Sequence, residues 1–343
     1  MRQKKNKNSL VVYSQITKIV EPAIAKILLS STHKKYHNVV KYQISAGGKR
    51  LRPILAILIC KMMGGREKDV LCPAAALEIL HNYTLIIDDI LDHGKLRRNK
   101  PTVWKKFGKS MAELIAIDYV ASVFDIPDEQ KNKNEITRIL AKTLKAVTDG
   151  QIFDILFEQS GRDDESYVTK NRYSQISLKD YFEMVRKKTA SLFTACAEVG
   201  GLCAGASAGK TKSLKKFGLN LGIAFQIQDD ILDIFGEEKK FGKKIGKDII
   251  ERKLGNIVIL LAMAEFNLRG KEKFLSILRK KRIKNGDVAR GITLLKKTNA
   301  LTKAQKLETS FIKKAKRVLA GLPRNKWNET LGELVDFLST RKA

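Results

Sequence analysis

Apolar residues recur along most of this chain at the spacing of helix faces, and short polar stretches separate these segments. In residues 9–29, for example, Ile16, Val20 and Ile24 follow one another four residues apart. No alternation of apolar and polar positions is long enough to predict a strand. The pattern therefore predicts an all-α fold, with helices at 9–29, 54–63, 77–92, 110–124, 136–159, 180–203 and 219–235, and further amphipathic helices from residue 256 onward.

The segment 77–92, LEILHNYTLIIDDILD, places three aspartates on an otherwise apolar helix. At about 3.6 residues per turn, Asp88 and Asp92 lie about 40° apart around the helix axis, and Asp89 lies about 60° beyond Asp92. Carboxylates held this close repel one another, and burying them without partners is costly. Aspartate oxygens that leave room for water and phosphate are ligands that Mg²⁺ prefers. A metal site is the functional interpretation, and a solvated helix face is the alternative.

The same spacing returns in FQIQDDILD, residues 225–233, where Asp229, Asp230 and Asp233 again lie inside an apolar segment. Two apolar helices with the same arrangement of carboxylates are difficult to explain as solvated faces. We therefore expect the two helices to form two walls of one cavity.

Between and beside the aspartates lie basic segments that also contain glycine or hydroxyl residues. SAGGKRLRP at 45–53 is a glycine turn before an apolar helix, an arrangement that suits anions because backbone N–H groups and the helix dipole add to the side chains. HGKLRRNKPT at 93–102 follows the first aspartates, where its arginines could contact a metal-bound phosphate. A polar patch, GQIFD at 150–154, interrupts an apolar stripe. A polar loop is predicted at 161–177, and no role is assigned to Asp163 and Asp164 within it.

Composition narrows the class of protein. The chain has 343 residues, 43% of them hydrophobic and only 6 of them proline, which suits one large core of long helices. No linker rich in Ser, Thr or Pro divides it, so we expect a single domain over residues 1–343. The net charge of +30 favours anionic partners: phosphorylated substrates, nucleic acid or an anionic membrane surface. Most of the lysines are expected to lie on solvated faces.

The cysteines and the apolar runs bear on location. Cys60, Cys72, Cys196 and Cys203 form no CxxC pair and have apolar neighbours, as expected of free thiols in a reducing compartment. No run reaches the roughly 18 apolar residues of a membrane span, and the basic start is followed by no secretory pattern. A cytoplasmic protein is expected, with peripheral contact to an anionic membrane surface left open.

Five motifs now stand in one order between Gly47 and Gly255: GGKRLRP, then DDILD with a following RR and KPT, then KKTAS, FQIQDDILD and GKKIGKD. In this order the sequence resembles the trans-prenyl diphosphate synthases, or polyprenyl synthetases, such as geranylgeranyl and farnesyl diphosphate synthases. These enzymes elongate isoprenoid chains head to tail. The resemblance implies an isoprenoid-synthase helical bundle around a central cavity, with the core motifs at 47–255 and less diagnostic basic helices at 256–343.

The resemblance also implies roles for individual residues. Mg²⁺, three ions per active site, would be held on an allylic diphosphate by Asp88, Asp89, Asp92, Asp229, Asp230 and Asp233. That diphosphate would be lined by Arg97, Lys188, Thr189, Gln226, Lys244 and Lys253, with Lys247 nearby. Isopentenyl diphosphate would be bound by Lys49, Arg52, His81 and Arg98. Catalysis is expected to depend on Asp88, Asp89, Asp92, Arg97, Lys188, Asp229 and Asp230.

In the family, the position five residues before the first aspartate and its neighbour help to form the floor of the product tunnel; here they are Tyr83 and Thr84. A tyrosine beside a small residue resembles short-chain synthases and implies a C20 product, geranylgeranyl diphosphate. The alternative for Tyr83 is a core aromatic. By resemblance the enzyme is expected to be a homodimer.

Other functions stay open at this point. A farnesyl (C15) or longer-chain polyprenyl diphosphate synthase would share every motif. A non-catalytic subunit of a heteromeric synthase would be expected to have lost one aspartate cluster or the lysine of KKTAS, and neither is lost here. A terpene cyclase would not need GGKRLRP for a second diphosphate. A basic nucleic-acid binder would explain the charge but not two aspartate clusters that repel phosphate in the absence of metal, so no nucleic acid is expected as a partner.

Overall fold

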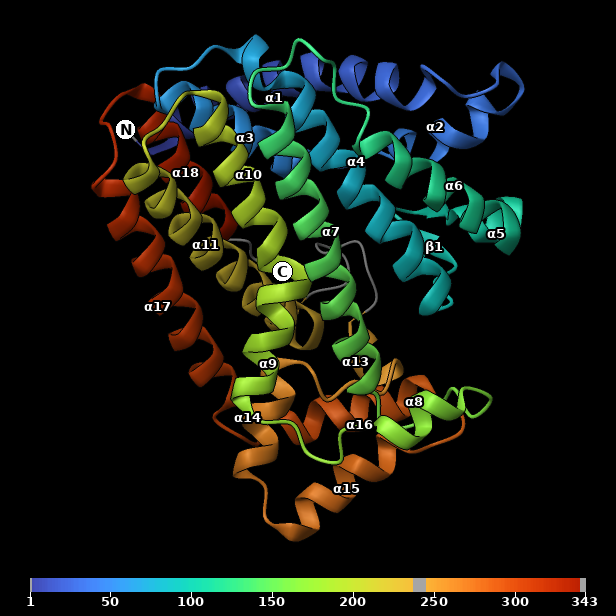
Figure 1. Ribbon diagram of the computed structural model, residues 1–343. Helices are drawn as coiled ribbons and strands as arrows, with labels where there is room; N and C mark the ends of the chain where they lie inside the picture. The colour runs from blue at the N-terminus through green and yellow to red at the C-terminus, as the bar shows by residue number, and fades with distance from the viewer. Residues whose placement is uncertain (1, 237–244, 340–343) are drawn as a thin grey trace. The chain divides into compact units, whose positions relative to one another are not determined.

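The computed structural model describes residues 2–236 and 245–339, with side chains from residue 9 onward. Among these residues nearly all regular structure is helical (Figure 1), which confirms the all-α prediction. A two-stranded antiparallel hairpin, β1 (Leu96–Arg97) and β2 (Lys100–Pro101), is too short to have been predicted from alternation.

The helices of the first half of the chain are α1 (Arg2–Leu29), η1 (Lys34–Tyr36), α2 (His37–Ser45), α3 (Leu51–Met62), α4 (Glu67–Leu91), α5 (Val103–Phe107), α6 (Lys109–Val123) and α7 (Lys133–Leu156). Those of the second half are α8 (Ser166–Asn171), α9 (Leu178–Val185), η2 (Arg186–Ala190), α10 (Ser191–Cys203), α11 (Ala208–Phe235), α13 (Lys247–Ile250), α14 (Ile257–Glu265), α15 (Leu268–Leu278), α16 (Asn285–Leu295), α17 (Ala300–Ala320) and α18 (Lys326–Ser339).

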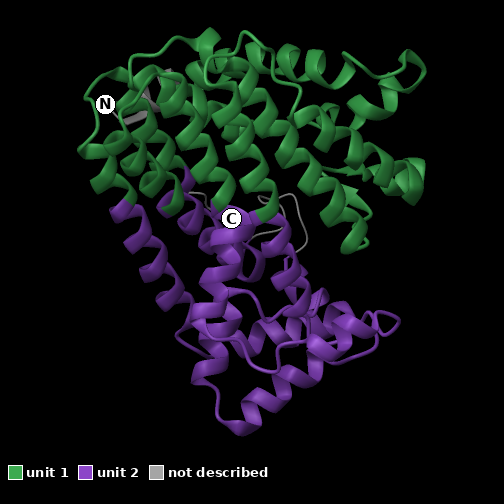
Figure 2. Cartoon of the chain, viewed as in Figure 1, with its two compact units in different colours: residues 1–145, 191–219, 315–337 green, residues 146–190, 220–314, 338–343 purple. Residues whose placement is uncertain are grey.

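The chain divides into two compact units, each assembled from separate segments (Figure 2). Unit 1 comprises 1–145, 191–219 and 315–337, and unit 2 comprises 146–190, 220–314 and 338–343. Because each unit draws on three distant segments, the chain offers no point at which one unit could be separated from the other by a single cut.

Unit 1 is built on α3, which is buried along almost its whole length and packs against α4 and α10. Gly200 of α10 lets the two helices approach closely, since a Cβ atom there would lie 2.5 Å from the carbonyl oxygen of Ala56. All four cysteines belong to this unit and are free thiols, three of them buried.

The aspartates of the first cluster lie at the end of α4, which packs against α1, α3, α6 and α10 within unit 1. This helix is long and apolar enough to cross a membrane by length and composition, a test that core helices of ordinary globular proteins also pass. Its apolar residues, such as Leu77, Ile79 and Leu80, are fully buried in unit 1. The apolar surface of α4 is thus used for packing in this fold.

Unit 2 corrects two predictions of local structure. The helix predicted at 180–203 is interrupted by a π-helical turn, η2, at the KKTA residues, and the polar loop predicted at 161–177 contains the short helix α8. Helix α9 also begins earlier than predicted, because Ser177 caps it and Asp180 completes a capping box. Neither a π turn nor a two-turn helix has a periodicity long enough to read from sequence.

Candidate functional site

In unit 1, the first aspartate cluster is joined to the hairpin that follows it. Asp89 is only 5% exposed, and its two carboxylate oxygens accept hydrogen bonds from Arg97 Nε at 2.7 Å and Nη2 at 2.9 Å. Burial by itself lowers the pKa of Arg97, but the hydrogen bonds and charge of Asp89 raise it above the usual range. Asp89 and Arg97 therefore form a buried, fully charged pair.

The hairpin explains why Arg97 points back to α4. Arg98 and Asn99 both have positive φ, 52° and 61°, as the two central residues of a tight hairpin turn do. This turn pairs Arg97 with Lys100 across the strands. The two arginines of the sequence RR thus contact different residues, because Arg97 lies in the strand and Arg98 in the turn.

Arg98 belongs to a cationic group at the start of α3. A Cβ atom on Gly48 would lie 2.9 Å from the Arg98 guanidinium and 3.0 Å from that of Arg50, so the GGKR turn and the RR turn lie against each other. Arg50 is 2% exposed, has a positive φ of 48° and ion-pairs with the buried Glu78 at 3.4 Å. Burial raises the pKa of Glu78, although Arg52 and Arg50 act in the opposite direction.

His81 faces the same cations. Burial first, and then the charges of Arg52 and Arg98, lower its pKa well below the ordinary value, so the imidazole is neutral near pH 7. The structure thus brings together three of the four residues expected at isopentenyl diphosphate: Arg52, His81 and Arg98. The fourth, Lys49, places its ammonium 5.3 Å from the ring centre of Phe337 of α18.

The two residues expected at the tunnel floor lie on α4, one turn or more before Asp88. Tyr83 is half-buried, and burial together with the charge of Asp88 raises its pKa. The hydroxyl of Thr84 donates to the carbonyl oxygen of His81 at 2.7 Å, which turns its polar atom back onto the helix.

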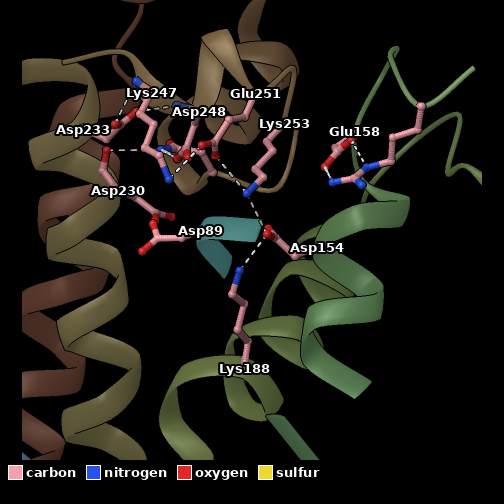
Figure 3. A network of polar contacts seen from close by, with 12 residues as sticks. Asp89, Asp154, Glu158, Lys188, Asp230, Asp233, Lys247, Asp248, Glu251 and Lys253 are labelled. Atoms are coloured by element: carbon pink, nitrogen blue, oxygen red, sulfur yellow. Dashed lines mark hydrogen bonds and ion pairs between the residues drawn. The ribbon is translucent and has the colours of Figure 1, made fainter. Parts of the chain in front are cut away.

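In unit 2, Asp230 and Asp233 of the second aspartate cluster accept hydrogen bonds from neutral donors within residues 2–236 and 245–339. Asp230 is 3% exposed and accepts hydrogen bonds from neutral donors: Gln226 Nε2 at 2.7 Å, Tyr181 Oη at 2.8 Å and the Ile257 amide at 2.9 Å. Asp233 accepts from the amides of Lys247 and Asp248, at 3.0 and 3.1 Å, at the start of α13 (Figure 3).

The carboxylates of Asp230 and Asp233 are buried close to a third carboxylate, that of Asp248, so negative charge is crowded in this part of unit 2. Burial, and next the nearby charge of Asp248, raise the pKa values of both Asp230 and Asp233 well above the ordinary value. The second cluster therefore favours a proton, or another cation, where the first cluster has Arg97.

The lysines expected at the allylic diphosphate are also in unit 2, and their partner was not predicted. Lys188 Nζ lies 2.7 Å and Lys253 Nζ 2.8 Å from the same Asp154 oxygen (Figure 3). Thr189 donates to Gln226 Oε1 at 2.6 Å. The signal in the sequence was the polar patch at 150–154, to which no role was given. Lys244 lies outside the described residues.

Within residues 2–236 and 245–339, no three His, Cys, Asp or Glu side chains come together as a preformed metal site. Mg²⁺ is usually held by one or two carboxylates, several waters and substrate phosphate oxygens, so it does not need such a group. The donor set here is all carboxylate oxygen, and the crowding at Asp230 and Asp233 favours a cation. The residues present fit Mg²⁺ completed by a diphosphate.

The chain is similar in sequence to proteins of one family. The family model described as Polyprenyl synthetase matches residues 33–295. The chain is 36% identical over 265 residues to a short chain isoprenyl diphosphate synthase of Methanocaldococcus jannaschii, covering 76% of each chain. It is also 36% identical to a geranylgeranyl diphosphate synthase of Saccharolobus solfataricus, covering 79% of this chain and 80% of that protein.

Among solved structures, a geranylgeranyl pyrophosphate synthetase from Pyrococcus horikoshii matches with a TM-score of 0.85 at 31% sequence identity. The match covers 98% of this chain and all of that one. The similarity in fold therefore extends beyond the motif-bearing part of the sequence.

Proposed function

This chain belongs to the polyprenyl synthetase family and is a prenyltransferase, and from that premise we propose that it joins isopentenyl diphosphate to an allylic diphosphate to give geranylgeranyl diphosphate. The observation that carries the proposal is the half-buried group of Arg52, His81 and Arg98 beside the GGKR turn. It supplies positive charge and a neutral imidazole for a second diphosphate, which an enzyme acting on one diphosphate does not need.

The chemistry requires charge stabilisation rather than a nucleophilic side chain. Breaking the allylic C–O bond leaves a carbocation and a diphosphate that carries extra negative charge. Arg97, Lys188 and Lys253 supply positive charge for that diphosphate, as stabilisation of a developing charge requires. The carbocation is then captured by the double bond of isopentenyl diphosphate, and the departed diphosphate accepts the proton that is lost.

We assign Mg²⁺ to the two aspartate clusters, where it would supply Lewis-acid stabilisation of the leaving diphosphate. Asp89 already binds Arg97 with both oxygens, and Asp230 and Asp233 accept hydrogen bonds with both of theirs. We propose that Asp88, Asp89, Asp92, Asp229, Asp230 and Asp233 together hold the ions, and that the hydrogen bonds to Asp89, Asp230 and Asp233 orient the two clusters.

Turnover with defined substrates tests the function. The purified chain is incubated with Mg²⁺, radiolabelled isopentenyl diphosphate and dimethylallyl, geranyl or farnesyl diphosphate, and the products are separated by thin-layer chromatography. We expect elongation that Asp88→Ala reduces by at least about 100-fold. Asp163→Ala is the matched control, because Asp163 is an exposed aspartate in a loop. No elongated product with any primer, or full activity of Asp88→Ala, would refute the enzyme proposal.

The length of the product is assigned to Tyr83. A half-buried ring on the helix that carries the first cluster is suited to limit how far a growing chain extends along α4. Tyr83→Ala is expected to shift the product beyond C20, while Tyr167→Ala, which alters an exposed tyrosine, leaves it unchanged. A farnesyl product from the natural chain, or an unaltered distribution in Tyr83→Ala, would remove this assignment.

We also propose one functional domain over residues 1–343, a homodimer and a cytoplasmic location. The free state of all four cysteines supports a reducing compartment. On α6, Leu114 and Ile117 are 58% and 66% exposed, so this helix has apolar surface for a second copy of the chain. Light scattering of Ile117→Glu, expected to be monomeric, tests the dimer, and sedimentation with anionic vesicles tests peripheral membrane contact.

A further inference from the structure

Asp154, in the last turns of α7, is a buried carboxylate to which the reaction as described gives no role. It is 5% exposed, and one of its oxygens contacts both Lys188 Nζ, at 2.7 Å, and Lys253 Nζ, at 2.8 Å (Figure 3). Burial by itself would raise the pKa of Asp154, but the charges of Lys188 and Lys253 hold it well below the ordinary value. Asp154 is thus a permanent anion between two cations.

The backbones that carry the two lysines are also fixed to this part of α7. A Cβ atom on Gly150 would lie 2.2 Å from the amide nitrogen of Lys188, so the π turn packs directly on α7 where α7 has no side chain. The residues on either side of Lys253 form backbone hydrogen bonds with the segment that follows α7. The Gln159 amide donates to the Arg252 carbonyl oxygen at 2.9 Å, and the Leu254 amide donates to the Phe157 carbonyl oxygen at 3.2 Å.

The pairing continues beyond Lys253. Glu251 lies 3.0 Å from Lys253 Nζ and 2.7 Å from Lys247 Nζ, so lysines and carboxylates alternate along Lys188, Asp154, Lys253, Glu251 and Lys247. Two ammonium groups sharing one oxygen would repel each other without the carboxylate. Lysine side chains are also flexible, and ordering them is a substantial part of the cost of binding an anion.

We propose that Asp154 is a positioning residue that holds Lys188 and Lys253 together, before substrate binds, as one site for the allylic diphosphate. The proposal rests on the assignment of these lysines to the allylic diphosphate. Asp154 itself contacts the lysines and not the reacting atoms. The neighbouring Gly150 admits the backbone of the π turn, and Asp154, four residues later on the same helix face, receives the side chain.

The test compares Asp154→Asn with Asp287→Asn in the full chain. Asp287 is 3% exposed, also belongs to unit 2 and also pairs with two cations, Lys280 and Arg290, which have no proposed part in the reaction. We expect Asp154→Asn to raise KM for the allylic diphosphate roughly tenfold, the effect of losing two preordered side chains, with KM for isopentenyl diphosphate unchanged. Asp287→Asn is expected to change neither KM.

The affinity for inorganic diphosphate in the presence of Mg²⁺, measured by calorimetry, is a readout that does not depend on turnover. Asp154→Asn should weaken this affinity by about the same factor by which the substitution raises the allylic KM. Asp154→Glu keeps the charge, and its affinity should stay within about threefold of that of the natural chain. Equal rises in both KM values, or unaltered diphosphate binding in Asp154→Asn, would overturn the proposal. If the natural chain is inactive but binds diphosphate, and Asp154→Asn weakens that binding, the proposed reaction is refuted and the positioning role stands.

Discussion

Asp89 and Asp230 occupy the same place in two copies of DDILD, and their surroundings differ in charge. Asp89 in unit 1 is bound at both oxygens by the Arg97 guanidinium, whereas Asp230 in unit 2 is bound by an amide side chain, a phenol and a backbone amide. The first carboxylate is neutralised by the protein. The second is solvated by neutral donors, and Asp248 adds negative charge beside it. Identical motifs therefore need not have identical electrostatics, because the partners come from elsewhere in the chain.

Replacing the central aspartate of each cluster by asparagine should produce the largest difference between them. Asp89→Asn leaves the Arg97 guanidinium largely buried without its carboxylate, and we expect it to lower the free energy of unfolding by about 3 kcal/mol. Asp230→Asn keeps neutral partners and removes one of the crowded charges, so it should cost less than about 1 kcal/mol, the value of one hydrogen bond that must rearrange. Urea denaturation at pH 7 in metal-free buffer measures both. Equal losses would show that the two clusters are held in the same way.

Neutralising Asp248, the additional carboxylate beside the second cluster, is expected to increase the free energy of unfolding. Asp248→Asn retains an oxygen that can accept the hydrogen bond from Asn256 and removes the charge that raises the pKa values of Asp230 and Asp233. In metal-free buffer it should raise the free energy of unfolding by about 1 kcal/mol, because one negative charge beside two buried carboxylates is removed. Adding Mg²⁺ with inorganic diphosphate should cancel the gain, since a bound cation supplies the same relief. Destabilisation by Asp248→Asn in metal-free buffer would argue against charge crowding.

The sequence allowed the fold class, most helices and most of the candidate residues to be predicted, because each depends on local periodicity or on a contiguous motif. The π turn at 186–190 was missed, since one residue more or less in a helix leaves no mark on apolar spacing. The partner of Lys188 was missed for another reason. Asp154 is 34 residues away in the sequence, and only packing at Gly150 brings it near.

The different environments of the two aspartate clusters were equally hidden. FQIQDDILD and LIIDDILD carry the same aspartate spacing, and nothing in either segment says that Arg97 or Tyr181 will be the partner. Arg97 is near in sequence and was assigned to diphosphate, but its pairing with Asp89 depends on the hairpin turn at Arg98 and Asn99. Long-range partners of buried charges thus required the structure.

The smallest expected effect is a dependence of stability on pH, and it arises from His81 beside the arginines of unit 1. Because the pKa of His81 in the folded chain is well below the ordinary value of 6.5, the unfolded chain binds the extra proton first as the pH falls. The free energy of unfolding of the natural chain therefore falls as the pH drops below 6.5. In His81→Gln this contribution is absent, because glutamine binds no proton. At pH 6.0 the natural chain should lose about 0.8 kcal/mol relative to His81→Gln, compared with the difference at pH 7.5. If the difference between the natural chain and His81→Gln is independent of pH from 7.5 to 6.0, burial and the nearby arginines do not keep His81 neutral. The contrast between a cation-rich first region and a carboxylate-crowded second region would then rest on the aspartates alone.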